Sequence, residues 1–337
     1  MKTYLSGIQA SGRPHLGNYF GAIRGHVEAS RGEGEHFYFV ADYHALTTVE
    51  DPAVLRERTL EVVVTYLACG LDPESATLFR QSDVPEVTEL TWLLSCVTGM
   101  GLLERAHSYK DKLAKGVKPS VGLFTYPILM ASDILAYDAT HVPVGKDQIQ
   151  HVEMTQDMAG YFNSRFGNSR FGNSKSGAVF TRPEAVVHAD DRVAKVPGLD
   201  GQKMSKSYGN DIWLFETGKK LKKRVNQFVT DSRPPEEPKD PDELAIFGLL
   251  RLFLAPDELA DWEARVRAGG EGAPGYGHLK VRLVEAIEDG FADIRARREE
   301  LLADKGEVER ILRVCGERAR ERARATRDRA LAACGLR

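Results

Sequence analysis

Apolar residues near the start of the chain form short runs separated by stretches with helical spacing. The runs at residues 4–8, 37–40 and 77–79 predict buried strands. Between them, Leu16, Phe20, Ile23 and Val27 recur at helical spacing, and a second helical pattern covers residues 53–69. A strand, a helix and a strand within about 40 residues are typical of a βαβ unit with parallel strands. The pattern therefore predicts a doubly wound α/β sheet, whose ligands bind outside the carboxyl ends of the strands.

The rest of the sequence divides into a mixed part and a purely helical part. Residues 126–135 predict a helix after Pro127, residues 142–144 a strand ending at Gly145, and residues 149–162 another helix. A tandem Asn-Ser-Arg-Phe-Gly repeat within residues 163–174 predicts an exposed loop. Beyond residue 216, a basic run and a proline-rich connection lead into helical patterns alone. We expect an α/β domain over residues 1–216 and an all-helical domain over residues 217–337.

Composition narrows the possible classes of protein. Of the 337 residues, 42% are hydrophobic and 28% charged, and the net charge is −3, so any nucleic-acid contact must come from local basic patches. The four cysteines form no C-x-x-C pair, so we expect free thiols and no zinc or iron–sulfur site. The sequence has neither a signal-like start nor an apolar run of membrane-spanning length. We therefore expect a cytoplasmic protein.

The first joint between strand and helix is a candidate phosphate site. His15, Gly17 and Asn18 lie where the helix begins, and helix N-termini attract anions through free N–H groups. The bare backbone at Gly17 would let a flat base approach, while His15 and Asn18 could bind phosphate oxygens. The alternative is that His15 is a turn residue and Asn18 a helix cap.

A second candidate is the loop Gly-Gln-Lys-Met-Ser-Lys-Ser-Tyr-Gly-Asn at residues 201–210. It places Lys203 and Lys206 among small hydroxyl side chains on a backbone flanked by glycines. Such lysines suit a polyphosphate whose charge shifts during a reaction. The alternative is an exposed basic turn, and the same two interpretations apply to Lys112.

Residues 126–148 contain a candidate pocket. Tyr126, Met130 and Asp133 fall on one face of the predicted helix. A carboxylate on an apolar face must be hydrogen-bonded, either to nearby backbone or to a ligand. As a ligand acceptor, it would reject molecules that lack a donor. At the following strand end, Asp147 and Gln148 are candidates for binding a ribose hydroxyl and an ammonium group.

Taken together, these motifs resemble those of the bacterial tryptophanyl-tRNA synthetases, which are class I aminoacyl-tRNA synthetases. The resemblance extends over nearly the whole chain. It rests on residues 6–9, 11–12, 17–18, 42–45, 126–133, 142–148, 203–207 and 229–232.

The resemblance implies a Rossmann-like catalytic domain over residues 1–216, in which about residues 80–185 contain the dimer interface and the tryptophan pocket. It also implies an anticodon-reading helical domain, a homodimer, and ATP with Mg²⁺ as a cofactor. The implied reaction joins L-tryptophan to tRNA(Trp) through a tryptophanyl-adenylate and releases pyrophosphate and AMP. No general base is needed, because the attacking carboxylate is already ionised.

The resemblance also assigns roles to individual positions of this sequence. The implied tryptophan site comprises Leu5, Gly7, Ala41, His44, Tyr126, Met130, Asp133, Val142, Val144 and Gln148. The implied ATP site comprises Gln9, Ser11, His15, Gly17, Asn18, Gly145, Asp147, Lys203, Met204, Ser205, Lys206 and Ser207. The implied catalytic residues are Gln9, Lys112, Lys203 and Lys206.

Some positions depart from the family pattern. Leu5 and Ala41 stand where the family usually has phenylalanine and valine, so the implied pocket is wider unless neighbouring side chains refill the space. Two alternatives remain. One is tyrosine activation, although tyrosyl enzymes usually carry glutamine where Met130 stands. The other is a non-catalytic paralogue that binds RNA or a protein, although the lysines and Asp133 are intact.

Overall fold

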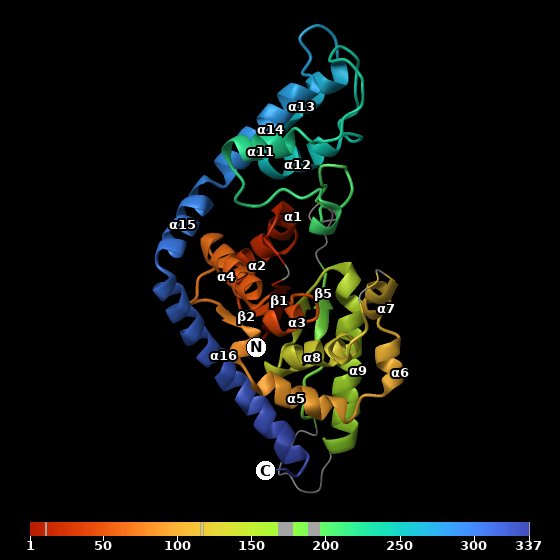
Figure 1. The fold of residues 1–337 in the computed structure, drawn as a ribbon, viewed down its shortest axis with the longest axis vertical. Helices are drawn as coiled ribbons and strands as arrows, with labels where there is room; N and C mark the ends of the chain where they lie inside the picture. Colours follow the sequence, from red (N-terminus) through yellow and green to blue (C-terminus); the bar gives the residue numbers. More distant parts are fainter. Residues whose placement is uncertain (11, 115, 117, 168–177, 188–195, 337) are drawn as a thin grey trace.

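The centre of the molecule is a five-stranded parallel sheet (Figure 1). The computed structural model describes residues 1–10, 12–114, 116, 118–167, 178–187 and 196–336, without the side chains of 107, 108, 112 and 113. The strands are β1 (Thr3–Gln9), β2 (Glu35–Ala41), β3 (Thr77–Arg80), β4 (His141–Pro143) and β5 (Glu184–Val186), in the order β3-β2-β1-β4-β5. The order reverses direction between β1 and β4, so their carboxyl ends form the crevice where such sheets bind ligands. The predicted doubly wound, Rossmann-like fold is confirmed.

Alternate side chains of β1, β2 and β3 enter two different cores. Leu5, Phe37 and Phe79 belong to one apolar cluster, whereas Tyr38 and Leu78 belong to the other. The second cluster is closed by α2 (Arg24–Ala29) and α4 (Pro52–Ala68). The first cluster is closed by α5 (Glu86–Ser95), α8 (Val121–Ala136) and α9 (Ile149–Phe166). This burial on both faces explains why the strands read as continuous apolar runs.

Shorter elements surround the carboxyl edge of the sheet. After β1 the chain forms α1 (Leu16–Asn18) and a π-helical turn (Tyr19–Ile23) before α2, and β2 leads directly into α3 (Asp42–Ala45). A 3-10 turn, η2 (Gln81–Asp83), follows β3. Farther along the chain are α6 (Met100–Glu104), α7 (His107–Ala114) and the 3-10 turns η3 (Lys146–Gln148) and η4 (Lys206–Tyr208).

The start of the predicted repeat loop is helical. Helix α9 continues to Phe166, so the first copy of the repeat ends a helix and does not open a loop. The Asn163 amide fixes this end, since it donates to the Phe180 carbonyl and accepts from the Val179 and Phe180 N–H groups. The second copy lies outside the described residues.

The chain after the lysine loop is helical, and its last helix returns to the sheet. Helices α11 (Gly218–Val225), α12 (Ala245–Phe253), α13 (Pro256–Ala268) and α14 (Tyr276–Gly290) share a third apolar cluster, which also includes Leu16 and Phe20 of the first turn and Met204 of the lysine loop. Helix α15 (Ala292–Ala303) then leads to α16 (Lys305–Ala333), which contacts β3, α5 and α8 along one side of the molecule (Figure 1). Ala319, Ala323 and Ala330 of α16 are buried in the first apolar cluster, because their small side chains let the helix approach closely.

Arginines on α16 form ion pairs within the chain. Arg320, Arg324 and Arg327 surround the buried Glu86 carboxylate, and Arg329 pairs with Asp138. In the structure they attach the last helix to the sheet domain.

Candidate active site

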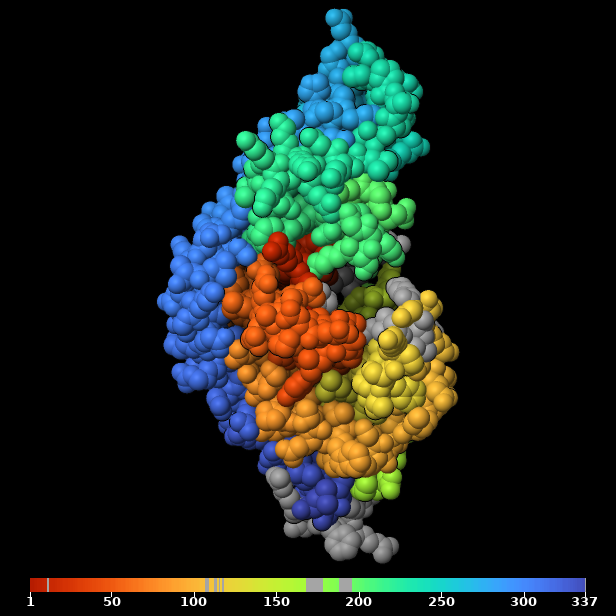
Figure 2. Space-filling model, viewed as in Figure 1, coloured from red at the N-terminus to blue at the C-terminus, as the bar shows by residue number. Residues whose placement is uncertain are grey.

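A cavity of about 420 Å³ opens at the carboxyl ends of β1, β2 and β4. This volume lies within the range of about 300–1,000 Å³ typical of small-molecule sites. The space-filling view shows the molecule hollowed between the orange segment after β2 and the green segment of the lysine loop (Figure 2). Ten lining residues are those assigned to the tryptophan site from sequence: Leu5, Gly7, Ala41, His44, Tyr126, Met130, Asp133, Val142, Val144 and Gln148.

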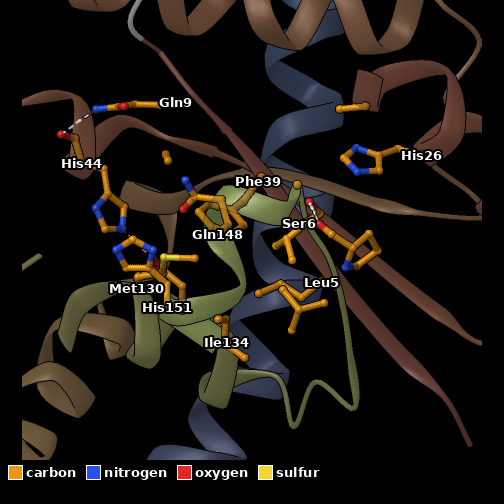
Figure 3. Close-up of a pocket in the computed structure, with 18 of the residues that line it drawn as sticks. Leu5, Ser6, Gln9, His26, Phe39, His44, Met130, Ile134, Gln148 and His151 are labelled. Atoms are coloured by element: carbon orange, nitrogen blue, oxygen red, sulfur yellow. Dashed lines mark hydrogen bonds and ion pairs between the residues drawn. The ribbon is translucent and has the colours of Figure 1, made fainter. Parts of the chain in front are cut away.

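The strand register explains why β1 lines the cavity. Leu5 and Gly7 are paired with Phe37 and Phe39, and Gln9 with Ala41, so these residues share one face of the sheet, and Gln9 and Ala41 lie at its carboxyl edge. A Cβ on Gly7 would lie 2.8 Å from the Phe39 ring, so this position has no room for a side chain. Leu5 and Ile134 lie at one part of the cavity, whereas Met130, His44 and His151 lie together at another (Figure 3).

The carboxylate of Asp133 is buried at the cavity wall, with only 1% of the residue exposed. It accepts hydrogen bonds from His44 Nε2 at 3.0 Å and from Gln81 Nε2 at 2.9 Å to each oxygen. Burial raises the pKa of Asp133, and the hydrogen bonds of His44 and Gln81 act in the opposite direction. Asp133 is thus an oriented acceptor in an otherwise mostly apolar part of the cavity.

Polar groups opposite this apolar part come from several elements. Gln9 donates to the His44 carbonyl at 3.0 Å, and the Tyr126 hydroxyl lies 2.7 Å from His151 Nε2. Gln148 donates to the Asp147 carboxylate at 2.9 Å. His151 and Gln81 were not identified from sequence. Both are polar residues close to a strand end, which is the signal that pointed to Gln148.

In the first strand-to-helix turn, His15 and Asn18 have the capping role. The His15 side chain accepts from the Asn18 N–H at 3.3 Å, while the Asn18 side chain accepts from the His15 N–H at 3.0 Å. The two residues therefore cap the helix reciprocally. Burial, followed by the nearby charge of Lys206, lowers the pKa of His15 to about 4, so its ring is neutral near pH 7.

The lysine loop lies against this turn. The Gly17 N–H points to Met204 Sδ at 3.4 Å, and the Leu16 N–H donates to the Ile212 carbonyl at 3.0 Å. A Cβ on Gly12 would lie 2.6 Å from Lys206 Nζ, so the ammonium group rests beside the backbone of the turn. Burial lowers the pKa of Lys206 to about 8. The structure therefore brings together two motifs that are about 190 residues apart in sequence.

One buried side chain shapes the loop. Asn210 donates to Asp200 at 2.7 Å and to the Lys203 carbonyl at 3.2 Å, and its oxygen accepts from the Ser205 N–H at 2.8 Å. Lys203 and Ser207 are exposed, and Lys206 and Ser205 are partly buried. Gly145 and Asp147 lie at the β4 end, with Asp147 exposed.

Two predicted residues cannot be placed in the site. Ser11 and the side chain of Lys112 lie outside the described residues, although Lys112 belongs to α7. Within the described part of the chain, no three or more His, Cys, Asp or Glu side chains are grouped to hold a metal ion.

A parallel sheet whose crevice carries a capped His-x-Gly-Asn turn and a Lys-Met-Ser-Lys-Ser loop defines a class I aminoacyl-tRNA synthetase. The family model of class I tRNA synthetases (W and Y) matches residues 1–258, and the chain belongs to this family. Its relatives place it more narrowly. The chain is 53% identical to a tryptophan–tRNA ligase of Rhodopirellula baltica over 99% of both chains, and 49% identical to that of Fusobacterium nucleatum over 95% and 94%.

Solved structures agree with this placement. The tryptophanyl-tRNA synthetase of Campylobacter jejuni, complexed with ADP and tryptophan, superposes with a TM-score of 0.90 at 44% identity, covering 99% of this chain and 100% of that one. The Mycoplasma pneumoniae enzyme gives 0.80 at 31% identity, covering 100% and 98%. The predicted resemblance to bacterial tryptophanyl-tRNA synthetases is confirmed. The comparisons support the tryptophan interpretation over the tyrosyl and non-catalytic alternatives.

Proposed function

We propose that this chain joins L-tryptophan to tRNA(Trp) at the expense of ATP, and that the cavity around Asp133 binds the amino acid. The observation that carries the proposal is an oriented, buried carboxylate on the wall of a mostly apolar cavity at the carboxyl ends of the strands. In this arrangement Asp133 accepts the indole N–H, and Met130 packs against the ring, since thioethers contact aromatic rings favourably. A site whose acceptor is placed for a hydrogen-bond donor of the ligand rejects molecules that lack this donor.

The remaining cavity residues orient the reacting carboxylate. Tyr126 and Gln148 bind the α-ammonium group of tryptophan, and Gln9, at the end of β1, approaches the α-phosphate. The tryptophan carboxylate attacks the α-phosphorus, so the bond to pyrophosphate breaks and tryptophanyl-adenylate forms. Positioning and electrostatic stabilisation supply the catalysis, because the nucleophile is already ionised.

ATP occupies the turn and the loop in this proposal. Its base and phosphates lie along His15, Gly17 and Asn18, and its ribose lies near Gly145 and Asp147. Mg²⁺ enters bound to the ATP phosphates. The ammonium groups of Lys203 and Lys206 stabilise the negative charge that develops on pyrophosphate. Ser11, Met204, Ser205, Ser207 and Lys112 complete the proposed contacts.

The second step transfers the tryptophanyl group to a ribose hydroxyl of the terminal tRNA adenosine, which releases AMP. Four exposed lysines of α11 support contact with the tRNA backbone: Lys219, Lys220, Lys222 and Lys223. We assign residues 217–337 to anticodon recognition, and the chain to the cytoplasm, where its tRNA substrate is charged. No described helix combines the length and apolar character needed to cross a membrane.

We also propose a homodimer formed through the segment of about residues 80–185. Three exposed large apolar side chains on α5, α6 and α8 support this interface, and α5 and α6 both pack against α8: Trp92, Met100 and Val121 are 70%, 63% and 79% exposed. Large apolar side chains left exposed in this way are typical of a surface that a partner covers. Light scattering should give the mass of a dimer for the wild type and of a monomer for Met100→Glu/Val121→Glu. A wild-type monomer would contradict the proposed interface.

Parallel ATP–pyrophosphate exchange assays with tryptophan and tyrosine test the reaction. We expect exchange with tryptophan alone, followed by tryptophanylation of tRNA(Trp). Exchange that favours tyrosine would contradict the role of the cavity, and the absence of any exchange would contradict the catalytic assignment. The double variant Lys203→Ala/Lys206→Ala should lose exchange but keep tryptophan binding, since its changes lie outside the cavity lining.

A further inference from the structure

Gln81 lies behind the cavity wall and contacts Asp133 without lining the cavity. It is the first residue of η2, directly after the edge strand β3, and 1% of it is exposed. A buried amide requires partners for its oxygen and its NH₂ group. Gln81 satisfies both across segments far apart in sequence, because its partners belong to α3 and α8.

The hydrogen bonds determine which way the Gln81 amide points. Its Oε1 accepts from the Tyr43 N–H at 3.1 Å and the His44 N–H at 3.4 Å, both in the first turn of α3. A flipped amide would direct N–H groups at these two donors, so the NH₂ group must face Asp133. There Nε2 lies 2.9 Å from each carboxylate oxygen.

The two Asp133 oxygens are not equivalent in this network. Oδ2 accepts from Gln81 and also from His44 Nε2 at 3.0 Å, whereas Oδ1 accepts from Gln81. Donors on both oxygens prevent the carboxylate from rotating about its Cβ–Cγ bond. Oδ1, with fewer protein donors, retains capacity for a donor from a ligand.

We propose that Gln81 is a positioning residue for amino-acid selection, which holds the Asp133 carboxylate so that Oδ1 receives the ring N–H of the substrate. This inference rests on the proposed function of the cavity. A fixed acceptor selects more sharply than a mobile one, because it cannot turn away when a ligand offers no donor. Gln81 therefore contributes to selectivity although it touches no substrate.

The neighbouring Ser82 offers a matched control on the same turn. Its hydroxyl and N–H bind the carboxylate of Asp42, not that of Asp133. Ser82→Ala should disturb η2 and the packing of α3 without freeing the Asp133 carboxylate. A general effect of damaging this turn should therefore appear in Ser82→Ala as well as in Gln81 variants.

The test compares two substrates that differ in the ring N–H. Exchange rates are measured with L-tryptophan and with β-(1-benzothiophen-3-yl)-L-alanine, whose ring has sulfur in place of the N–H group. In Gln81→Met, we expect kcat/KM for tryptophan to fall about tenfold, with a change of less than about twofold for the sulfur analogue. The ratio of the two values should therefore fall about tenfold, whereas Ser82→Ala should leave it unchanged.

A second variant separates the two ends of the amide. Gln81→Glu keeps an acceptor for α3 but turns a carboxylate toward Asp133, so the ratio should fall at least as far as in Gln81→Met. It also serves if Gln81→Met does not fold. Equal losses for both substrates in either folded variant, or an unchanged ratio, would overturn the inference. If the wild type shows no tryptophan-dependent exchange, the proposed function itself fails.

Discussion

The position of Lys206 predicts a pH dependence of ATP use that most surface lysines would not produce. Burial against the turn at Gly12 lowers the pKa of its ammonium group to about 8. A lysine is charged below its pKa, so the attraction for ATP phosphates is present at neutral pH and is lost as the pH rises through about 8. His15 does not confound this range, since its pKa is lowered to about 4.

The expected size of the effect follows from this pKa. A group with a pKa of about 8 is about three-quarters protonated at about pH 7.5 and about one-tenth protonated at about pH 9. We therefore expect kcat/KM for ATP to fall about eightfold between these values, since this parameter reports the free enzyme. At saturating ATP the fall in kcat should move to higher pH, because bound phosphate stabilises the ammonium group.

The assay is ATP–pyrophosphate exchange at saturating tryptophan across this range. Lys206→Arg should remove the fall, because arginine remains charged throughout. Lys203→Arg is the matched control, since it changes an exposed lysine of the same loop and leaves Lys206 in place. A flat wild-type profile, or a fall that persists in Lys206→Arg, would refute the role assigned to this group.

Three further predictions follow from the cavity and the last helix. Asp133→Ala should lower kcat/KM for tryptophan by about one to two decades, because losing a hydrogen bond to a charged group costs roughly 1.5–3 kcal/mol. An unchanged value would contradict the pocket assignment. Leu5→Phe/Ala41→Val should reduce exchange with ring-substituted tryptophans relative to tryptophan, because the larger side chains occupy the space beside the ring. Each buried methylene group is worth about 0.8 kcal/mol. An unchanged ratio of the two exchange rates would mean that neighbouring side chains already fill the space. Glu86→Ala should lower the free energy of unfolding, measured by chemical denaturation, by about 2 kcal/mol. This loss is smaller than that of breaking a fully buried ion pair, because Arg320 and Arg324 are 33% and 46% exposed. Equal stability of the wild type and the variant would show that these ion pairs contribute nothing.

Local patterns in the sequence were sufficient to predict the sheet and to recognise the family. The strands read as apolar runs because both faces of a parallel sheet are buried. The turn at His15 and the loop at Lys206 are each a continuous stretch of sequence, so each motif could be recognised by itself. All ten residues assigned to tryptophan lie on the wall of one cavity. Helical spacing placed Tyr126, Met130 and Asp133 on one face, whereas the remaining residues were assigned by the resemblance to the family.

The tertiary structure decided which partners the buried polar groups have and where the last helix packs. Gln81 reaches Asp133 across 52 residues, and Glu86 meets Arg320 across 234. Periodicity shows that a side chain is buried, but the path of the whole chain fixes what lies opposite it. The extension of α9 to Phe166 has the same cause, since Asn163 is fixed by Val179 and Phe180, which the sequence could not show to be near. A buried polar group requires a hydrogen-bond partner, but only the folded chain determines which residue supplies it.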